Sequence, residues 1–203
     1  MSHPLKHFIL VCKHRNQVIK NGFHLGFFFS FLTHDLSKFR PSEFITSSRY
    51  YRGDGSPIYN ERMANNYYSK VCQLHTRRNK HHWEYYTDFL VGRIIVRNIP
   101  YRYCMEYIAD VISASMTYNR KSFKRNMPYD YFMFVKESYY MTKATEEFLT
   151  KCFLSYRDSG FKHLKKKDTK KMYQKITSSL PDVEIFEEMK TSRKLPEIKK
   201  WKN

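Results

Sequence analysis

The stretch "MEYIADVISA", residues 105–114, places two carboxylates, Glu106 and Asp110, one helical turn apart in an otherwise apolar segment. Apolar residues such as Tyr107 and Val111 recur at helical spacing, so a helix is expected to resume after Pro100. Alone, Asp110 is explained equally well as an exposed residue or as the partner of a nearby arginine. Buried, its carboxylate would need a cation to offset the cost of removing it from water. The other elements of the chain therefore have to supply that cation or its ligands.

The same periodicity predicts helices on both sides of this segment. They are expected over residues 4–21 (ended by Asn21-Gly22), 24–38, from Pro41-Ser42 with Glu43 in the first turn, 59–78 and 129–156. The helix over 24–38 would carry Phe27, Phe28, Phe29 and Phe31 on all its sides. That pattern is typical of a buried central helix.

Three segments depart from helical spacing. "LVGRIIVRNIP", residues 90–100, is rich in β-branched residues and is consistent with either a short hairpin or an extended loop. "RGDGSP", residues 52–57, predicts a turn. The lysine-rich tail is expected to form one or two amphipathic helices. The sequence thus predicts an all-α fold of six or seven helices, with a domain over 1–157 and a basic helical C-terminal extension over 158–203.

Composition supports a folded chain with a strong positive charge. Hydrophobic residues make up 41% and aromatic residues 17% of the 203 residues, more than a disordered chain would contain. The formal net charge of +18 favours polyanionic partners, namely nucleic acid, nucleotides or an anionic membrane surface. Basic surfaces are also common in lysine-rich proteomes, so charge alone does not select among these.

The cysteines and the apolar stretches indicate the compartment. The four cysteines lie far apart without a CxxC pair, which favours reduced, buried thiols over a disulfide framework. The longest apolar stretch, residues 27–32, is far shorter than the roughly 20 residues of a membrane span. No signal peptide is evident. We therefore expect a cytoplasmic protein, or one of the host cytoplasm if it is viral.

Histidines gather at three places in the sequence. His14 lies in the first predicted helix, His34-Asp35 in the second, and "LHTRRNKHHWEYY", residues 74–86, holds His75, His81 and His82. A lone histidine is more often a surface or hydrogen-bonded core residue. Taken with Asp110, the set offers imidazole and carboxylate ligands that suit borderline and hard divalent metals. Because no cysteine joins the set, a structural zinc site of the finger type is disfavoured.

The order of these residues resembles that of the HD-domain metal-dependent phosphohydrolases. "HDLSK" is similar to the HDxxK form of their motif, and "HHWEYY" followed by "IADVISA" is similar to segments of the HD-GYP branch. The chain resembles still more the HD-like family DUF5662 of bacteria and phages, over about residues 3–156. The segments that carry this likeness are "HRNQVIKNGFHLG", "HDLSKFRPSEF", "YY" at 50–51, "RNKHHWEYY", "MEYIADVISASM" and "YMTKATEEFL". The Gly-Tyr-Pro segment is absent and the acid at Glu84 comes one place late, so cyclic dinucleotide hydrolysis is not implied.

The resemblance implies one or two divalent metal ions (Mn, Mg, Fe, Co or Ni). It assigns His14, His34, Asp35 and Asp110 to a first ion, and His75, His81 and His82 to a second ion bridged through Asp35. His75 and His82 are two helical turns apart and would share one face of a continuous helix, unless "RRNK" breaks it. Metal-activated water would then attack a phosphoryl group.

Further residues are assigned by their proximity in sequence to these ligands. Asp35 and Lys38 are the candidate catalytic residues, and Lys38, Arg78 and Lys80 the candidate substrate-binding residues. Arg77 and Arg78 fit a solvated basic loop slightly better than a phosphate-binding role. Glu106, one turn before Asp110, and Glu84 are candidates for orienting a histidine, whereas Glu43 fits a simple first-turn acid. Trp83, Tyr85 and Tyr86 could stack a base, although core packing is the commoner role.

Three functions are consistent with this pattern. The first is a phosphohydrolase or phosphodiesterase acting on a nucleotide or another small phosphorylated substrate. The second is a non-catalytic HD-like protein that binds nucleotides, or that holds nucleic acid through its basic tail. The third is a di-iron oxygenase, since the same ligand set serves both chemistries.

Overall fold

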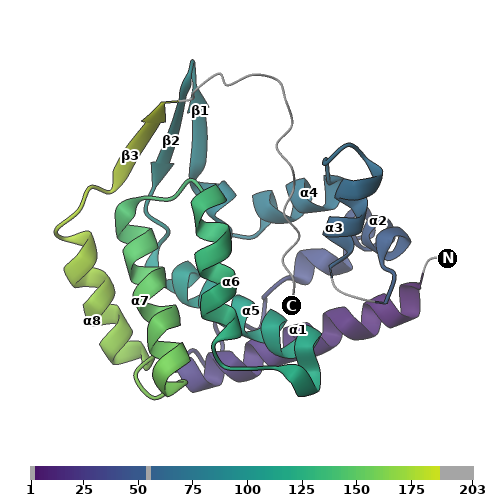
Figure 1. Cartoon of the computed structure of the whole chain (residues 1–203), viewed down its shortest axis with the longest axis horizontal. Coiled ribbons are helices and arrows are strands. Elements are labelled where there is room, and N and C mark those ends of the chain that lie inside the picture. Colours follow the sequence, from purple (N-terminus) through teal and green to yellow (C-terminus); the bar gives the residue numbers. More distant parts are fainter. Residues whose placement is uncertain (1–2, 54–55, 188–203) are drawn as a thin grey trace.

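The computed structural model describes residues 3–53 and 56–187. Within them the chain forms eight α-helices and a small three-stranded sheet (Figure 1). The helices are α1 (Pro4–Leu25), α2 (Pro41–Tyr50), α3 (Pro57–Ala64), α4 (Lys70–Arg78), α5 (Tyr101–Asn119), α6 (Met127–Val135), α7 (Lys143–Ser159) and α8 (Lys166–Thr177). The strands are β1 (Thr87–Leu90), β2 (Arg93–Arg97) and β3 (Val183–Glu187). The predicted helical class is confirmed, and the sheet is the departure from it.

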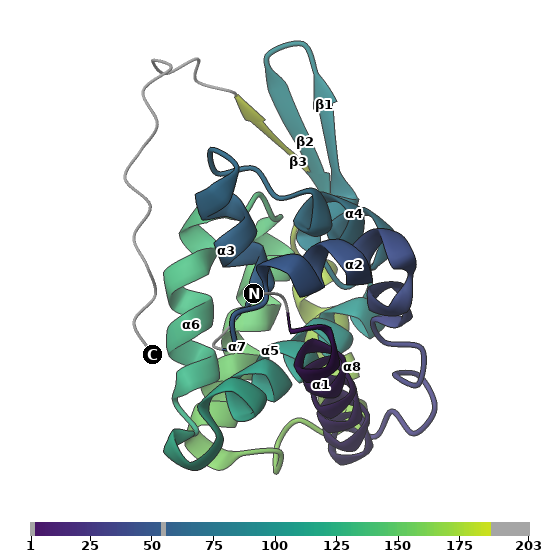
Figure 2. The same cartoon turned by 90° about the vertical axis from the view of Figure 1, so that its right-hand side faces the viewer.

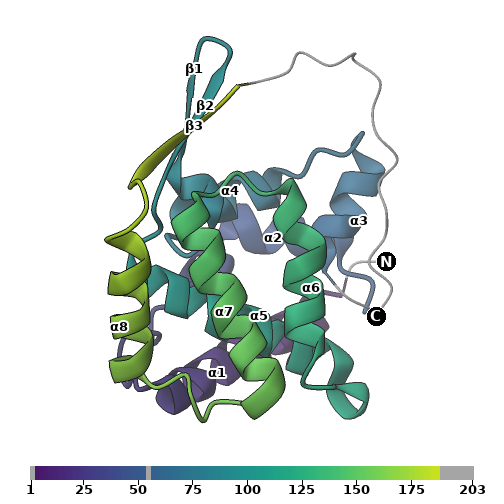
Figure 3. The same cartoon turned by 60° about the vertical axis from the view of Figure 1, so that its left-hand side comes forward.

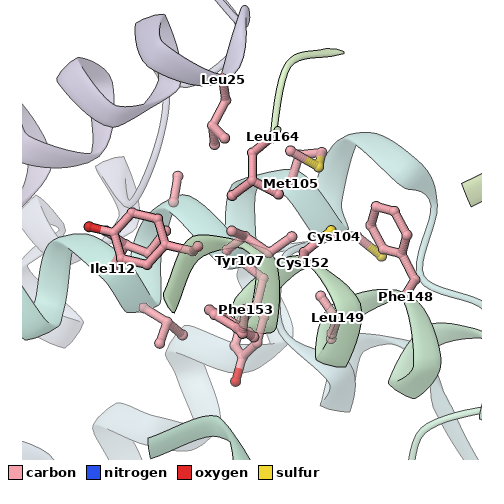
Figure 4. Close-up of a cluster of buried hydrophobic side chains, with 14 of the residues drawn as sticks. Leu25, Cys104, Met105, Tyr107, Ile112, Phe148, Leu149, Cys152, Phe153 and Leu164 are labelled. Carbon is pink, nitrogen blue, oxygen red and sulfur yellow. The ribbon is translucent and has the colours of Figure 1, made fainter. Parts of the chain in front are cut away.

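Helix α5 is the centre of the fold and begins directly after Pro100, as predicted. It packs against α1, α6 and α7 (Figure 3). Figure 4 shows its Met105 and Ile112 among buried side chains that come from α1, from α7 and from the chain before α8, including Leu25 and Phe153. Burying each of these large side chains stabilises the fold by about 1.5–3 kcal/mol. The segment that carries Asp110 is therefore held on several sides.

The predicted helix over 24–38 is wrong. Helix α1 runs through Asn21-Gly22 and ends at Leu25, because Gly26 adopts the left-handed conformation (φ 86°) that closes a helix. Residues 28–35 then form successive turns that lead into the short 3-10 helix η1 (Leu36–Phe39). The side chain of Arg102 donates to the carbonyl oxygen of Ser30 at 3.1 Å, so carbonyl groups outside a helix still find partners.

The phenylalanines of this segment do not surround a buried helix. Phe27 and Phe31 are buried and their rings stack at 5.2 Å, whereas Phe28 and Phe29 are 59% and 80% exposed. Phe31 lies so close to Gly22 that a Cβ atom on that glycine would come within 2.5 Å of the phenyl ring. Gly22 thus remains inside α1 because it allows the following loop to pack against the helix.

Two long predicted helices are each divided in two. The helix expected over 59–78 is interrupted because Asn66 and Tyr67 adopt positive φ angles. Ser69 and the buried carboxylate of Glu61 then satisfy the free N–H groups at the start of α4. The helix expected over 129–156 is interrupted after α6, and the hydroxyl of Thr142 accepts from the N–H of Thr145 to begin α7. Side-chain capping fixes both boundaries.

The segment over 90–100 forms a hairpin, the first of its two predicted interpretations. β1 pairs antiparallel with β2 through a two-residue connection, Val91-Gly92, with Gly92 at φ 70°. β3 pairs antiparallel on the other side of β2, so the sheet order is β1-β2-β3, and the sheet extends beyond the helices (Figure 2).

The described part of the tail contains α8 and β3 rather than helices alone. Leu164 and Ile176 belong to the same hydrophobic core as α5, and the hydroxyl of Tyr173 donates to the carbonyl of Ile99 at 2.8 Å. The domain boundary at residue 157 stays a prediction, and residues 188–203 of the extension lie outside the described residues.

The cysteines are free, and of the four only Cys104 and Cys152 are fully buried. Among the described residues, no helix combines the length and hydropathy needed to cross a bilayer.

The contact between Gly22 and Phe31 gives a stability prediction. Gly22→Ala gains about 1 kcal/mol of helix propensity, but it places a methyl group against a buried ring. We expect a net loss of about 1–3 kcal/mol in the free energy of unfolding, measured by urea denaturation. Adding Phe31→Leu should recover part of the loss, because the smaller side chain makes room for the methyl group. A Gly22→Ala protein at least as stable as the parent would contradict this packing.

Candidate metal centre

The predicted ligands come from five separate segments that meet around α5. His14 lies on α1, His75 on α4 and Asp110 on α5. His34 and Asp35 end the turns before η1, and His81 and His82 lie in the turn after α4. Sequence separations of up to about a hundred residues are thus closed by the packing of α1 on α5, of α2 on α1 and of α4 on α2 (Figure 2).

One group of four side chains matches the first predicted set of ligands. His14 Nε2 lies 2.9 Å from Asp110 Oδ1, and His34 Nε2 lies 3.2 Å from Asp35 Oδ2 and 3.7 Å from Asp110 Oδ1. One ligand atom from each of the four residues lies within 4.8 Å of the others. These atoms could therefore hold one ion.

A second group consists of His75, His81 and His82, whose ligand atoms also lie within 4.8 Å of one another. Asp35 lies between the two groups: its Oδ1 atom is 3.3 Å from His75 Nε2 and 3.6 Å from His81 Nε2. The three histidines do not share one face of a continuous helix, because α4 ends at Arg78 and a turn carries His81 and His82 back toward the centre. We call the two groups together the histidine-aspartate cluster.

Two carboxylates lie behind the histidines. Glu106 Oε1 is 3.0 Å from His34 Nδ1 and 3.5 Å from His81 Nδ1. Glu43 Oε2 is 3.2 Å from His75 Nδ1. When a carboxylate accepts the Nδ1 proton, the lone pair of the imidazole resides on Nε2, which here points into the cluster. Carboxylates in this position are the usual orienting partners of metal-binding histidines.

The centre of the cluster contains polar atoms without hydrogen-bond partners. Asp35 Oδ1 and the Nε2 atoms of His81 and His82 are buried in this state. Asp35 Oδ2 and His34 Nε2 lack a well-aligned hydrogen bond and are held by ion pairs, with Lys38 and His34 at Oδ2. An unsatisfied buried polar group costs about 1–3 kcal/mol. A divalent cation is the partner whose chemistry suits carboxylate oxygens and imidazole nitrogens together. The residues present therefore fit a metal ion.

The acids of the cluster are held in their ionised form. Burial raises the pKa of the Asp35 carboxyl, but His34 and Lys38 more than offset it, so that pKa lies well below its usual range. Burial also raises the pKa of the Asp110 carboxyl, but His14 and His34 more than offset this and lower that pKa well below its usual value. Hydrogen bonds from His34 and His81 outweigh burial at Glu106 and bring its pKa to about 2.

Most of the histidines are held neutral. Burial lowers the pKa of His14, of His75 and, most strongly, of His82. The neutral imidazole is the form that binds a metal. His34 differs: burial lowers its pKa, but Asp35 and the other carboxylates around it raise that pKa well above its ordinary value. His34 and Lys38 are thus the cations that face the buried acids Asp35 and Asp110.

The backbone places Asp35 in a special conformation. Its φ of 53° and ψ of 25° lie in the left-handed region, which few residues other than glycine, asparagine and aspartate adopt. The turn closes with the N–H of Lys38 donating to the carbonyl oxygen of Asp35 at 3.0 Å. It brings Lys38 Nζ to 2.6 Å from Asp35 Oδ2. The predicted catalytic pair is thus in direct contact.

Of the other predicted residues, Glu106 is the one whose side chain contacts histidines of the cluster. Arg78 donates to Glu43 Oε1 at 2.7 Å and so supports the carboxylate behind His75. Lys80 is exposed, with its Nζ 5.7 Å from the centre of the Tyr85 ring. Glu84 has a buried Oε2 atom without a hydrogen-bond partner, and burial raises its pKa. Trp83 stacks on Tyr139 at 5.3 Å, which is a packing role.

The sequence analysis missed the role of Glu43. Its carboxylate is buried and accepts from Ser37 and Arg78 as well as contacting His75. It is therefore more than a first-turn acid, although the pattern "RPSEF" gave no sign of this. Also missed is a narrow pocket of ≈ 60 Å³ beside the cluster, lined by His14, Lys38, Tyr118 and apolar residues of α1, α3 and α4.

Comparisons with known proteins place most of the chain in one family. A family model described as a family of unknown function, DUF5662, matches residues 3–155. This range contains every residue of the histidine-aspartate cluster. No curated protein and no solved structure shows significant similarity to the chain.

The partners of Glu43 predict a large effect on stability. A helix first-turn acid contributes about 0.3–1 kcal/mol, whereas loss of a buried carboxylate with three polar partners should cost about 1–3 kcal/mol. We expect Glu43→Gln to lower the free energy of unfolding by the larger amount in urea denaturation with chelator present. Asp168→Asn, an exposed first-turn acid of α8, is the matched control. Equal effects of the two substitutions would show that Glu43 stabilises the protein only as a first-turn acid of α2.

Proposed function

The chain belongs to the DUF5662 family, and we propose that it is a metal-dependent phosphohydrolase of HD type. Its substrate would be a nucleotide or another small phosphorylated molecule. The observation that carries the proposal is the convergence of imidazole Nε2 atoms on Asp35 and Asp110, with Glu106 and Glu43 on the opposite ring nitrogens. The likeness of "HDLSK" and "IADVISA" to HD motifs supports the same conclusion.

The residues that would hold metal are those of the histidine-aspartate cluster. His14, His34, Asp35 and Asp110 would hold a first ion, and His75, His81 and His82 a second, with Asp35 shared. A divalent ion bound there supplies a water of lowered pKa as the nucleophile at neutral pH. Glu106 and Glu43 keep the imidazole rings oriented, and the buried position of the cluster limits access of bulk water.

We expect Lys38 to bind the phosphoryl group. Burial lowers the pKa of its ammonium, but Asp35 and Asp110 raise that pKa by a larger amount, so the side chain stays charged. It lines the pocket together with His14 and His75, two of the proposed ligands. A cation at this position stabilises negative charge that develops on phosphoryl oxygens.

The size of the pocket favours recognition through the phosphate itself. A volume of ≈ 60 Å³ is small compared with the several hundred cubic ångströms of pockets that enclose whole ligands. A phosphate-sized group can enter, while a base or sugar would remain outside. The lining also includes Val71 and Pro57, whose apolar surfaces would exclude water from the entering group.

The proposal is tested at Asp35. Asp35→Asn keeps the shape and tolerates the left-handed backbone better than alanine would, but it removes the charge shared by both groups. We expect bound Mn²⁺, measured by elemental analysis, to fall by at least one ion per chain, and hydrolysis of nucleotides and generic phosphodiesters to be lost. Asp88→Asn on the exposed hairpin is the matched control.

Full activity in the Asp35→Asn protein would reject the site. Iron in the purified protein together with oxygen consumption, and no hydrolysis across the substrate panel, would assign the cluster to oxygenase chemistry instead.

Two glutamates with different surroundings provide a second prediction. Glu106→Gln removes the carboxylate that orients His34 and His81, and should weaken Mn²⁺ binding by about 10–100-fold. Activity should return at high Mn²⁺ concentration. Glu84→Gln alters a half-buried glutamate that has no ion pair with the proposed ligands, so the affinity for Mn²⁺, measured by isothermal titration calorimetry, should stay unchanged. Equal losses in both variants would contradict an orienting role for Glu106.

A further inference from the structure

The outward face of α1 is apolar. The inward face carries the buried residues His7, Val11, His14, Val18 and Leu25. On the other side, Leu5, Phe8, Ile9 and Phe23 are exposed. At about 100° per residue these four lie within an arc of about 100° opposite the buried side. A surface helix normally presents polar residues there, and in this arc Asn16 is the polar exception.

The loop after α1 continues this apolar surface. The Phe28 ring packs edge-on against Phe23 at 5.7 Å, and Phe29 is the most exposed phenylalanine of the described residues. Arg15 of α1 donates to the carbonyl oxygen of Leu32, which holds the loop against the helix. We define the α1 face as Leu5, Phe8, Ile9, Phe23, Phe28 and Phe29. An exposed apolar surface of this extent indicates an interaction site.

A row of lysines borders the α1 face. Lys6, Lys13 and Lys20 recur every seven residues, so they lie along one side of α1 at intervals of about 10.5 Å. Among the described residues, lysine ion pairs are formed by Lys38, Lys136 and Lys151, not by these three. Lys13 and Lys20 also line, with Arg120, an open hollow of ≈ 430 Å³. The border is therefore a row of cations without acidic partners.

We propose that the α1 face docks on an anionic lipid surface. Phe28 and Phe29 would enter the boundary between headgroups and acyl chains, and the lysine row would pair with the headgroups. A basic border beside aromatic and aliphatic side chains is the composition of helices that lie in the membrane interface. A second copy of the chain is a poorer occupant, because two lysine rows and two net charges of +18 would be brought together.

Docking in this way leaves the core of the protein unchanged. The inward face of α1 stays packed on α5, since His14 and Asn21 bond Asp110 and Ser113 there. Figure 1 shows α1 along one margin of the molecule, with the sheet at the opposite end. Contact through α1 therefore requires neither unfolding nor rearrangement, and the proposal does not depend on the enzymatic one.

Vesicle cosedimentation of the full chain tests the proposal. We expect binding to vesicles of phosphatidylglycerol and phosphatidylcholine, weaker binding in high salt, and little binding to phosphatidylcholine alone. Lys6→Gln, Lys13→Gln and Lys20→Gln together should weaken binding on the order of 100-fold, at about fivefold per lysine. Phe28→Ser with Phe29→Ser should weaken it by at least about tenfold.

Matched controls alter the same chemistry elsewhere on the chain. Lys167→Gln, Lys170→Gln and Lys171→Gln on α8 remove the same charge, and Phe89→Ser with Val91→Ser removes apolar surface from the hairpin tip. Both controls should bind vesicles nearly as well as the parent, with all variants first shown to be folded by circular dichroism. The proposal is overturned if the parent does not bind the anionic vesicles or if the α8 control loses as much affinity as the α1 variant. It is also overturned if Phe28→Ser with Phe29→Ser abolishes a stable dimer and leaves vesicle binding unchanged.

Discussion

The structure depends on burying several carboxylates at one place in a chain of strong positive charge. Asp35, Asp110, Glu106 and Glu43 all lie within the packed centre, and each is offset by imidazole or cationic groups rather than by water. Such an arrangement is tolerated only if the opposing charges are fixed in position. The helices around α5 supply that fixation, so the packing of the fold and the chemistry of the cluster rest on the same contacts.

How much of this could be predicted depends on whether the signal is local. The helix that carries Asp110 was predictable because its period and its start at Pro100 are contained in about twenty residues. The histidines and aspartates could be gathered together because imidazole and carboxylate suit the same divalent metals, whereas the set with His14, His34 and Asp35 was implied by the resemblance to HD motifs. Nothing local distinguishes Glu43 from a helix-end acid, since its role depends on Arg78 and His75, more than thirty residues away.

The loop over 27–35 could not be predicted from periodicity for a related reason. Its phenylalanines recur closely enough to suggest a buried helix, yet two positions decide otherwise. Gly26 ends α1 in a left-handed conformation, and Gly22 leaves room for Phe31 to pack against the helix. Hydrophobic pattern reports which residues can be buried, whereas the glycines report where the backbone turns. In residues 27–35 the two glycines, and not the hydrophobic pattern, determine the path of the backbone.

This turn also explains why Asp35 can belong to both groups of histidines. A helix over 24–38 would have kept the backbone of Asp35 in the right-handed region and placed its carboxylate on one helical face. The left-handed conformation instead lets both oxygens face the centre, one toward His34 and Lys38, the other toward His75 and His81. A residue other than aspartate, asparagine or glycine would lose about 1–2 kcal/mol in the same backbone conformation. The position thus combines a conformational preference with a chemical requirement, and aspartate is the residue type that meets both.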